Sequence, residues 1–215
     1  SLKNVIIKNT KGINEELLNL TGGVVFYNSN VNLEHVTFDY TEAEDALNIV
    51  NSKYTMQNVQ FKNTRSDAFD SDFSEGSIFN TKFFYIGGDA ADFSGSRVKI
   101  RNVSAKNVRD KAVSVGEASK ADINNVDFIN VGVAIASKDG SMVNVADCVV
   151  VDFKLMAFMT YVKKKNYSTP TLIIDRCKTE LGLEHTRLNG IGYSDSVYFR
   201  QKGTILTVDG NTNII

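Results

Sequence analysis

The sequence predicts an all-β protein, a right-handed parallel β-helix of about eight coils with three short parallel sheets. Three observations lead to this prediction: a repeat of 22 or 23 residues, an alternation of apolar and polar residues within each repeat, and many turn-forming residues beside a single proline. A coil needs three short strands joined by tight turns, and each repeat is long enough to supply them. One domain is expected for residues 1–215, because this length can enclose a single core.

The repeat is anchored on one small or β-branched position. That position is occupied in turn by Val5, Val36, Val59, Thr81, Val103, Val126, Cys148 and Cys177. The five central steps are 23, 22, 22, 23 and 22 residues long. Apolar and polar residues alternate after the anchor, as in Val59-Gln60-Phe61, which is the period of a strand with one buried face. Leucine-rich repeats lack this frame and propeller blades need about 40 residues, so the three-sheet solenoid is favoured.

Asparagine precedes the anchor in four central repeats, at Asn58, Asn80, Asn102 and Asn125. Asparagine tolerates the left-handed backbone conformation that tight turns require, and its side chain can bond to an equivalent side chain in the next coil. We therefore expect a ladder of stacked asparagines at one turn of the solenoid.

Both ends depart from the period. Residues 1–29 are expected to form a longer first coil, with a short helix or loop near residues 14–20, and a long loop is expected near residues 163–170. Residues 178–215 are expected to form a degenerate C-terminal cap, which a solenoid needs over its open edge. Because the chain begins within a strand pattern, we expect it to be part of a larger protein.

Charge and composition narrow the possible partners. Lys and Arg number 24 against 25 Asp and Glu, so a broad basic field for nucleic acid is not expected. No apolar run is long enough to span a bilayer, and the first ten residues lack the layout of a signal peptide. The two cysteines occupy the same position in consecutive coils, where they either stack as small apolar residues or form a disulfide.

The strand that closes each coil carries acidic residues at repeat spacing. Asp45, Asp67 and Asp89 form one column, and Asn48, Asp70 and Asp92 form a second column three residues later. The alternation predicts that Asp70 and Asp92 point outward. Coils lie about 4.8 Å apart, so these carboxylates should repel one another, which raises a pKa or demands a counter-ion.

Three interpretations of these columns remain open. The first is a site for a hard cation such as Ca²⁺, with Asp67, Asp70, Asp89 and Asp92 as ligands. The second makes two of the aspartates the acid and base of a glycoside hydrolase. The third makes Asp45, Asp67 and Asp89 turn formers whose carboxylates accept hydrogen bonds from local backbone N–H groups.

A second cluster is basic and aromatic. Tyr161, Lys163 and Lys164 lie at or in the expected long loop. They could stack on sugar rings or bind anionic groups. The alternative is a solvated loop with scattered lysines.

The chain resembles a known group of proteins in the segments GGVVFYNS, EDALNIV, SDAFDSDFS, GGDAADFSGS, DKAVSVGE, IASKDGS and FMTYVKKK. These are similar to the right-handed β-helix regions of exported bacterial proteins in the pectate-lyase-like superfamily, also called carbohydrate-binding and sugar-hydrolase repeats. The resemblance implies an extracellular or cell-envelope location and a carbohydrate polymer as partner. It also implies a calcium-holding acidic cluster followed by a basic residue that abstracts a proton, for which Lys111 is the candidate, with Arg109 and Lys138 nearby.

Two classes of function follow. The first is a module that binds an anionic polysaccharide along the aspartate-bearing sheet, and that could also cleave or modify it. For an enzyme, a lyase is favoured over a hydrolase, because the NTD, DD, GHG and RIK motifs of the polygalacturonase-type hydrolases are absent and neither His35 nor His185 sits in such a frame. The second is a non-catalytic scaffold that contacts neighbouring domains of the same protein. Short turns in the central coils favour binding or scaffolding over turnover.

Overall fold

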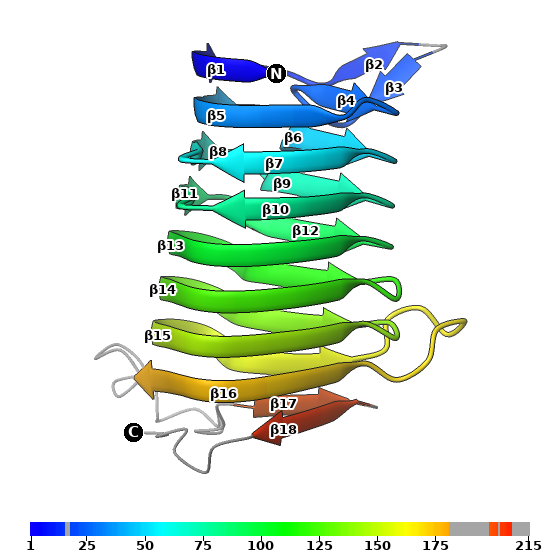
Figure 1. Cartoon of the computed structure of the whole chain (residues 1–215), viewed down its shortest axis with the longest axis vertical. Helices are drawn as coiled ribbons and strands as arrows, with labels where there is room; N and C mark the ends of the chain where they lie inside the picture. Colours follow the sequence, from blue (N-terminus) through cyan, green and yellow to red (C-terminus); the bar gives the residue numbers. More distant parts are fainter. Residues whose placement is uncertain (16–17, 181–197, 202, 208–215) are drawn as a thin grey trace.

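The computed structural model describes residues 1–15, 18–180, 198–201 and 203–207, and every regular element among them is a strand. Nearly all of these strands join one parallel stack, so the predicted all-β solenoid is confirmed. The solenoid has about six turns, slightly fewer than the eight coils expected. Figure 1 shows the strands stacked one above another along the long axis.

The described strands fall into groups along the chain. The N-terminal coils contain β1 (Leu2–Lys8), β2 (Ile13–Glu15), β3 (Leu18–Leu20), β4 (Val25–Tyr27), β5 (Val31–Thr41) and β6 (Asp45–Val50). The next two coils contain β7 (Lys53–Gln57), β8 (Gln60–Thr64), β9 (Asp67–Asp72), β10 (Glu75–Phe79), β11 (Lys82–Ile86) and β12 (Ala91–Ser94). The last coils contain β13 (Arg97–Gly116), β14 (Lys120–Lys138), β15 (Met142–Tyr161), β16 (Thr171–Glu180), β17 (Tyr198–Gln201) and β18 (Thr204–Thr207).

Three ladders run along the solenoid, and we number them in chain order. The first sheet contains β7 and β10, the second contains β8 and β11, and the third contains β6, β9 and β12. The long strands β13, β14 and β15 bend through all three sheets. Val103 pairs with Val126, Val126 with Cys148, and Cys148 with Cys177, so residues one repeat apart do lie above one another.

The turn between the first and second sheets holds three of the four predicted members of the asparagine ladder, whereas Asn58, with a φ of 56°, contacts the His35 ring at 3.3 Å. Asn80, Asn102 and Asn125 all have left-handed φ angles, of 48°, 55° and 54°. Asn102 Nδ2 donates to Asn80 Oδ1 at 3.2 Å, and Asn125 Nδ2 donates to Asn102 Oδ1 at 2.8 Å. Asparagine is therefore chosen here for a backbone conformation that most residues avoid, and for a side chain that joins successive coils.

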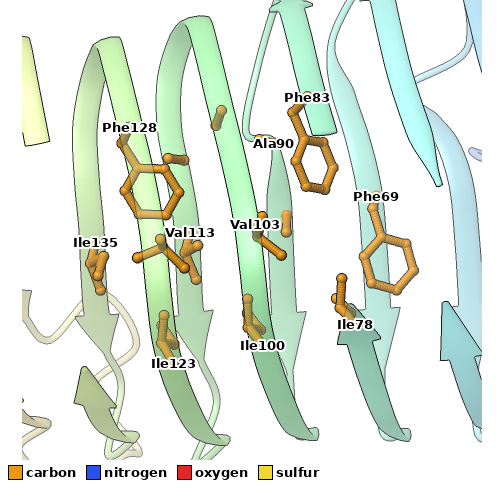
Figure 2. Packing of buried hydrophobic residues seen from close by; sticks show 14 of the residues in the cluster. Phe69, Ile78, Phe83, Ala90, Ile100, Val103, Val113, Ile123, Phe128 and Ile135 are labelled. Atoms are coloured by element: carbon orange, nitrogen blue, oxygen red, sulfur yellow. The ribbon is translucent and has the colours of Figure 1, made fainter. Parts of the chain in front are cut away.

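The interior is filled by inward side chains of all three sheets. Figure 2 shows Phe83 and Phe128 of the second sheet, Ile100 of the first and Phe69 of the third around one core. The second sheet stacks its rings, with ring centroids 4.8 Å apart between Phe38 and Phe61 and 5.1 Å apart between Phe61 and Phe83. This stacking of like on like follows from the repeat length, because the same inward position recurs in each coil.

A buried serine ladder lies at the turn between the third sheet and the next coil. The backbone N–H groups of Ser52, Ser74, Ser96 and Ser119 each donate to the hydroxyl of the serine one coil later, at 3.0, 2.9, 2.8 and 3.1 Å. The last acceptor is Ser141. These hydroxyls satisfy backbone donors that would otherwise be buried without a partner.

The ends match the expected irregularity. Residues 13–20 contain the antiparallel hairpin β2–β3, so the helix alternative is wrong there. Residues 162–170 form the expected long loop after β15. Cys148 and Cys177 form a disulfide, with their Cα atoms 4.4 Å apart.

The C-terminal cap remains a prediction, because residues 181–197 and 208–215, His185 among them, lie outside the described residues. The two strands that are described there continue the parallel stack: β17 pairs with β15, and β18 pairs with β16. In the described part of the chain there is no helix with the length and apolar character to cross a bilayer.

Candidate functional site

The third sheet brings the predicted acidic residues together. Asp45 pairs with Asp67 in register, and the row formed by Asn48, Asp70 and Asp92 continues to Ser114 in the next coil. Each step of this row is one coil, so side chains 22 residues apart in sequence become neighbours. Figure 1 shows β6, β9 and β12, which carry these residues, at successive levels behind the first sheet.

The first acidic column has a structural role. Asp67 Oδ1 accepts the backbone N–H of Asp89 at 2.8 Å, and Asp89 Oδ1 accepts the backbone N–H of Lys111 at 2.8 Å. Both carboxylates accept backbone N–H groups, as the third interpretation expects, but these N–H groups are 22 residues away, so the expected local capping is wrong. Each carboxylate reaches the backbone of the next coil rather than its own, so it helps to hold two coils together.

The carboxyl groups of the second row are bonded to side chains from other coils. Asn48 Nδ2 donates to one carboxyl oxygen of Asp70 and to one of Asp72, both at 3.1 Å. Asp92 lies 3.3 Å from the Lys138 ammonium, which belongs to a strand two coils away. One carboxyl in the row is thus held by an amide and the other by a cation.

Burial and crowding change the protonation of this face. Burial, with Asp72 and Asp45 as the nearest like charges, raises the pKa of Asp70 to about 9. Burial also raises the pKa of Asp45 to about 7 and that of Asp89 to about 7, although Lys111 opposes the shift at Asp89. Asp70 therefore carries a proton at neutral pH unless a cation lies against it.

Three carboxylates lie close enough to share a cation. One oxygen from each of Asp67, Asp89 and Asp92 lies within 4.8 Å of the others. Asp70, the fourth predicted ligand, is not in this group, and its carboxyl is held by Asn48. The predicted ligand set is therefore brought together in part.

The candidate base is tied into ion pairs. Lys111 Nζ lies 3.3 Å from Asp89 Oδ1 and 2.7 Å from Asp110 Oδ2. Burial alone would lower the pKa of Lys111, but Asp89 and Asp110 outweigh burial and raise the pKa. Burial alone would likewise lower the pKa of Lys138, but Asp92 outweighs burial and raises it. A proton-abstracting lysine needs the opposite direction.

The remaining predicted residues lie around the far end of this face. Tyr161 pairs in register with Lys138 and is partly exposed, whereas Arg109 is exposed at the bulge where β13 enters the third sheet. The backbone N–H groups of Lys163 and Lys164 donate to Asp139 Oδ1 at 2.6 and 2.7 Å. The Lys164 ammonium forms an ion pair with Glu117, so this charge is already engaged. These contacts hold the first residues of the loop against the coils.

Sequence reasoning missed Ser114. It follows Asp92 in the same row, is fully buried, and its hydroxyl has no hydrogen-bond partner among the described residues. A buried hydroxyl beside a carboxylate row is a costly arrangement unless something bonds to it. The 22-residue spacing from Asp92 could have identified this position, since the same step defines the whole row.

The comparisons with known proteins are sparse. No family model and no curated protein matches the chain. Among solved structures, the chain is similar to the catalytic domain of a GH87 α-1,3-glucanase in complex with nigerose, with a TM-score of 0.28 and 9% identity over 86% of this chain and 48% of that one. The chain thus spans about half the length of that domain, and the likeness is too weak to carry an argument about function. The fold is a parallel β-solenoid, as the strand register shows, and membership of the pectate-lyase-like superfamily stays a prediction.

Proposed function

We propose that this protein is a polysaccharide-binding module whose ligand lies along the outward face of the third sheet. One observation supports this most: Asn48, Asp70 and Asp92 repeat polar groups at the spacing of the coils, and the two aspartates are partly exposed although Asn48 is buried. A polymer presents its hydroxyl and carboxyl groups at regular intervals, and a solenoid offers matching groups at regular intervals. Carboxyl and amide groups suit sugar hydroxyls because they donate and accept hydrogen bonds.

An anionic polysaccharide would need a cation to approach these carboxylates. Asp67, Asp89 and Asp92 could hold Ca²⁺, which takes six to eight oxygen ligands and would leave positions open for sugar oxygens. The unpartnered hydroxyl of Ser114 beside Asp92 supports a fit, because it is an oxygen that lacks a partner in this row. Bound Ca²⁺ would supply the positive charge that links two sets of carboxylates.

Binding is proposed ahead of cleavage. Lys111 and Lys138 hold their protons more firmly than free lysines, because Asp89, Asp110 and Asp92 surround them. In that state they are suited to attracting a sugar carboxylate and unsuited to removing a proton. Tyr161, adjacent to Lys138, could pack against a sugar ring at the same end of the face.

A scaffold is the second candidate function. It is favoured by the serine and asparagine ladders, which make a stiff rod whether or not a ligand binds. An extracellular or cell-envelope location is part of both proposals. The Cys148–Cys177 disulfide supports that location, because such bonds persist in oxidising compartments.

The test uses the Asp70→Asn/Asp92→Asn double variant, with Asp127→Asn/Glu180→Gln, on exposed acids of the second sheet, as a matched control. We expect saturating Ca²⁺ to raise the melting temperature of the unsubstituted protein by about 5–10 °C, and polygalacturonate, alginate or a glycosaminoglycan to bind more tightly in Ca²⁺ than in EDTA. The double variant should lose most of both effects and the control should keep them. If Ca²⁺ produces no melting shift and does not strengthen binding of any of the three polymers, the scaffold is left as the function of the third sheet.

A further inference from the structure

A groove runs over the first sheet, on a different ladder from the acidic rows. It consists of two adjoining hollows of about 420 and 390 Å³. Lys53, Glu75 and Arg97 line both hollows, which makes them one continuous depression. Gly76, in the strand beneath the groove, faces the interior, where an added Cβ would lie 2.1 Å from the buried Tyr54 ring.

Phe73 forms one wall of this groove and is 64% exposed. Its ring lies against Gly95, where an added Cβ would be 2.6 Å from Phe73 Cδ1, so glycine is needed to seat the ring. Phe73 also has a left-handed φ of 50°, while Asn28 and Asn51 have the same conformation at the equivalent turn of the two preceding coils. A bulky residue in this conformation is unfavourable, and the fold itself is satisfied by asparagine there. The exposed ring therefore calls for a role other than folding.

Three of the four cations along the groove form no ion pair with an acid among the described residues. Arg97 and Lys99 point outward from β13 at alternate positions, and Lys120 is the register partner of Arg97. In the described part of the chain none of these three takes part in an ion pair, and Lys53 lies 4.0 Å from Glu75. The hollow of about 420 Å³ is lined by four cations and two acids, Glu75 and Asp122, which leaves an excess of two positive charges.

We propose that this groove is a second carbohydrate-binding surface and that it takes an acidic glycan. A sugar ring packs its apolar face on Phe73, and the carboxylate or sulfate of that sugar or its neighbour pairs with Arg97 and Lys99. An aromatic face beside a guanidinium fits this chemistry, because the ring binds the C–H face of a sugar while the planar guanidinium bonds an oxyanion with two parallel N–H groups. This surface needs neither the aspartates of the third sheet nor Ca²⁺, so it stands apart from the proposed function.

The test measures binding of polygalacturonate, heparin and dextran in EDTA, which supply carboxylate, sulfate and no charge respectively. The Arg97→Gln/Lys99→Gln variant is compared with Lys82→Gln/Lys106→Gln, which removes two exposed cations from the second sheet. Phe73→Asn is the third variant, and it should fold because asparagine already occupies this turn in two coils. We expect the Arg97/Lys99 variant to weaken binding of one or both acidic polymers at least tenfold, and Phe73→Asn to weaken it about fivefold, while Lys82/Lys106 changes it less than twofold and dextran does not bind.

Two results would overturn the inference. The first is equal weakening by the groove variant and the second-sheet control, which would mean that only net charge matters. The second is a DNA duplex that binds as tightly as heparin, with no effect of Phe73→Asn, which would make the groove a general polyanion surface. The Asp70→Asn/Asp92→Asn variant should bind normally in EDTA, so failure of the groove and failure of the third-sheet site give different patterns.

Discussion

The phenylalanine stack inside the second sheet stabilises the fold, whereas the crowding of carboxyl groups in the aspartate columns on the third sheet opposes it. Both arise because residues one repeat apart lie above one another. Phe38, Phe61 and Phe83 lie one coil apart and gain from contact with their own kind. Asp67 and Asp89 also lie one coil apart, yet burial and like charge raise the pKa of both. A solenoid repeats whatever its sequence repeats, so a costly column that persists over several coils needs a separate reason to exist.

The largest expected effect tests the favourable half of this comparison. Phe61→Ala removes the ring between Phe38 and Phe83 from a fully buried position. The free energy of unfolding should fall by about 3–5 kcal/mol, because the lost contacts leave a cavity. Chemical denaturation measures this loss. Leu155→Ala, at a position 51% exposed, is the control and should change stability by about 0.5 kcal/mol or less. A loss of similar size in both variants would mean that the ring stack adds nothing special.

The pH dependence of stability tests the unfavourable half. Asp45, Asp89 and Asp70 have folded pKa values of about 7, 7 and 9, above the ordinary value of about 3.9 for an unfolded chain. Between these limits the folded protein binds more protons than the unfolded chain, so stability falls as pH rises. In EDTA, we expect stability to fall throughout the range from pH 4.5 to pH 8.

Asp70→Asn sharpens that measurement. Removing the carboxyl with the highest pKa should flatten the fall in stability with pH, whereas Asp127→Asn on the exposed second-sheet surface should leave its slope unchanged. Denaturant melts at four pH values would show the difference. Stability that rises from pH 4.5 to pH 8 in the unsubstituted protein would contradict the electrostatic account of the aspartate columns.

The smallest expected effect concerns a polar column that does stabilise. Asn102→Ala removes the hydrogen bonds to Asn80 and Asn125 and places alanine at a φ of 55°. We expect a loss of about 1–2 kcal/mol, most of it from the left-handed backbone. Asn102→Gly removes the same side chain but permits this conformation, so it should lose less. Equal losses would show that the ladder bonds outweigh the backbone preference.

The fold could be predicted because its evidence is local and repeated. The step from Val103 to Val126 and on to Cys148 appears directly in the sequence, and the register reproduces it. The antiparallel pairing of β2 with β3 could not be predicted in place of a short helix or loop, because so short a stretch outside the repeat has too little periodicity to decide. Interruptions of the repeat are therefore where sequence reasoning is weakest.

The candidate site could be predicted only to the level of columns. The outward row of Asp70 and Asp92 follows from strand parity and repeat length. The Lys138–Asp92 ion pair does not, since it joins residues 46 apart and depends on how far a lysine side chain extends across an intervening coil. The protonation of Lys111 depends in the same way on Asp110, whose orientation at a bulge is not visible in the pattern.

The disulfide between Cys148 and Cys177 affects how the rod comes apart. Each coil of a solenoid contacts only its neighbours, so unwinding begins at an exposed end and proceeds coil by coil. The link spans the boundary between the last regular coil and β16, beyond the long loop, where a non-covalent contact would open most easily. A thiol reductant should therefore speed hydrogen exchange in β16 while leaving exchange in the central coils unchanged.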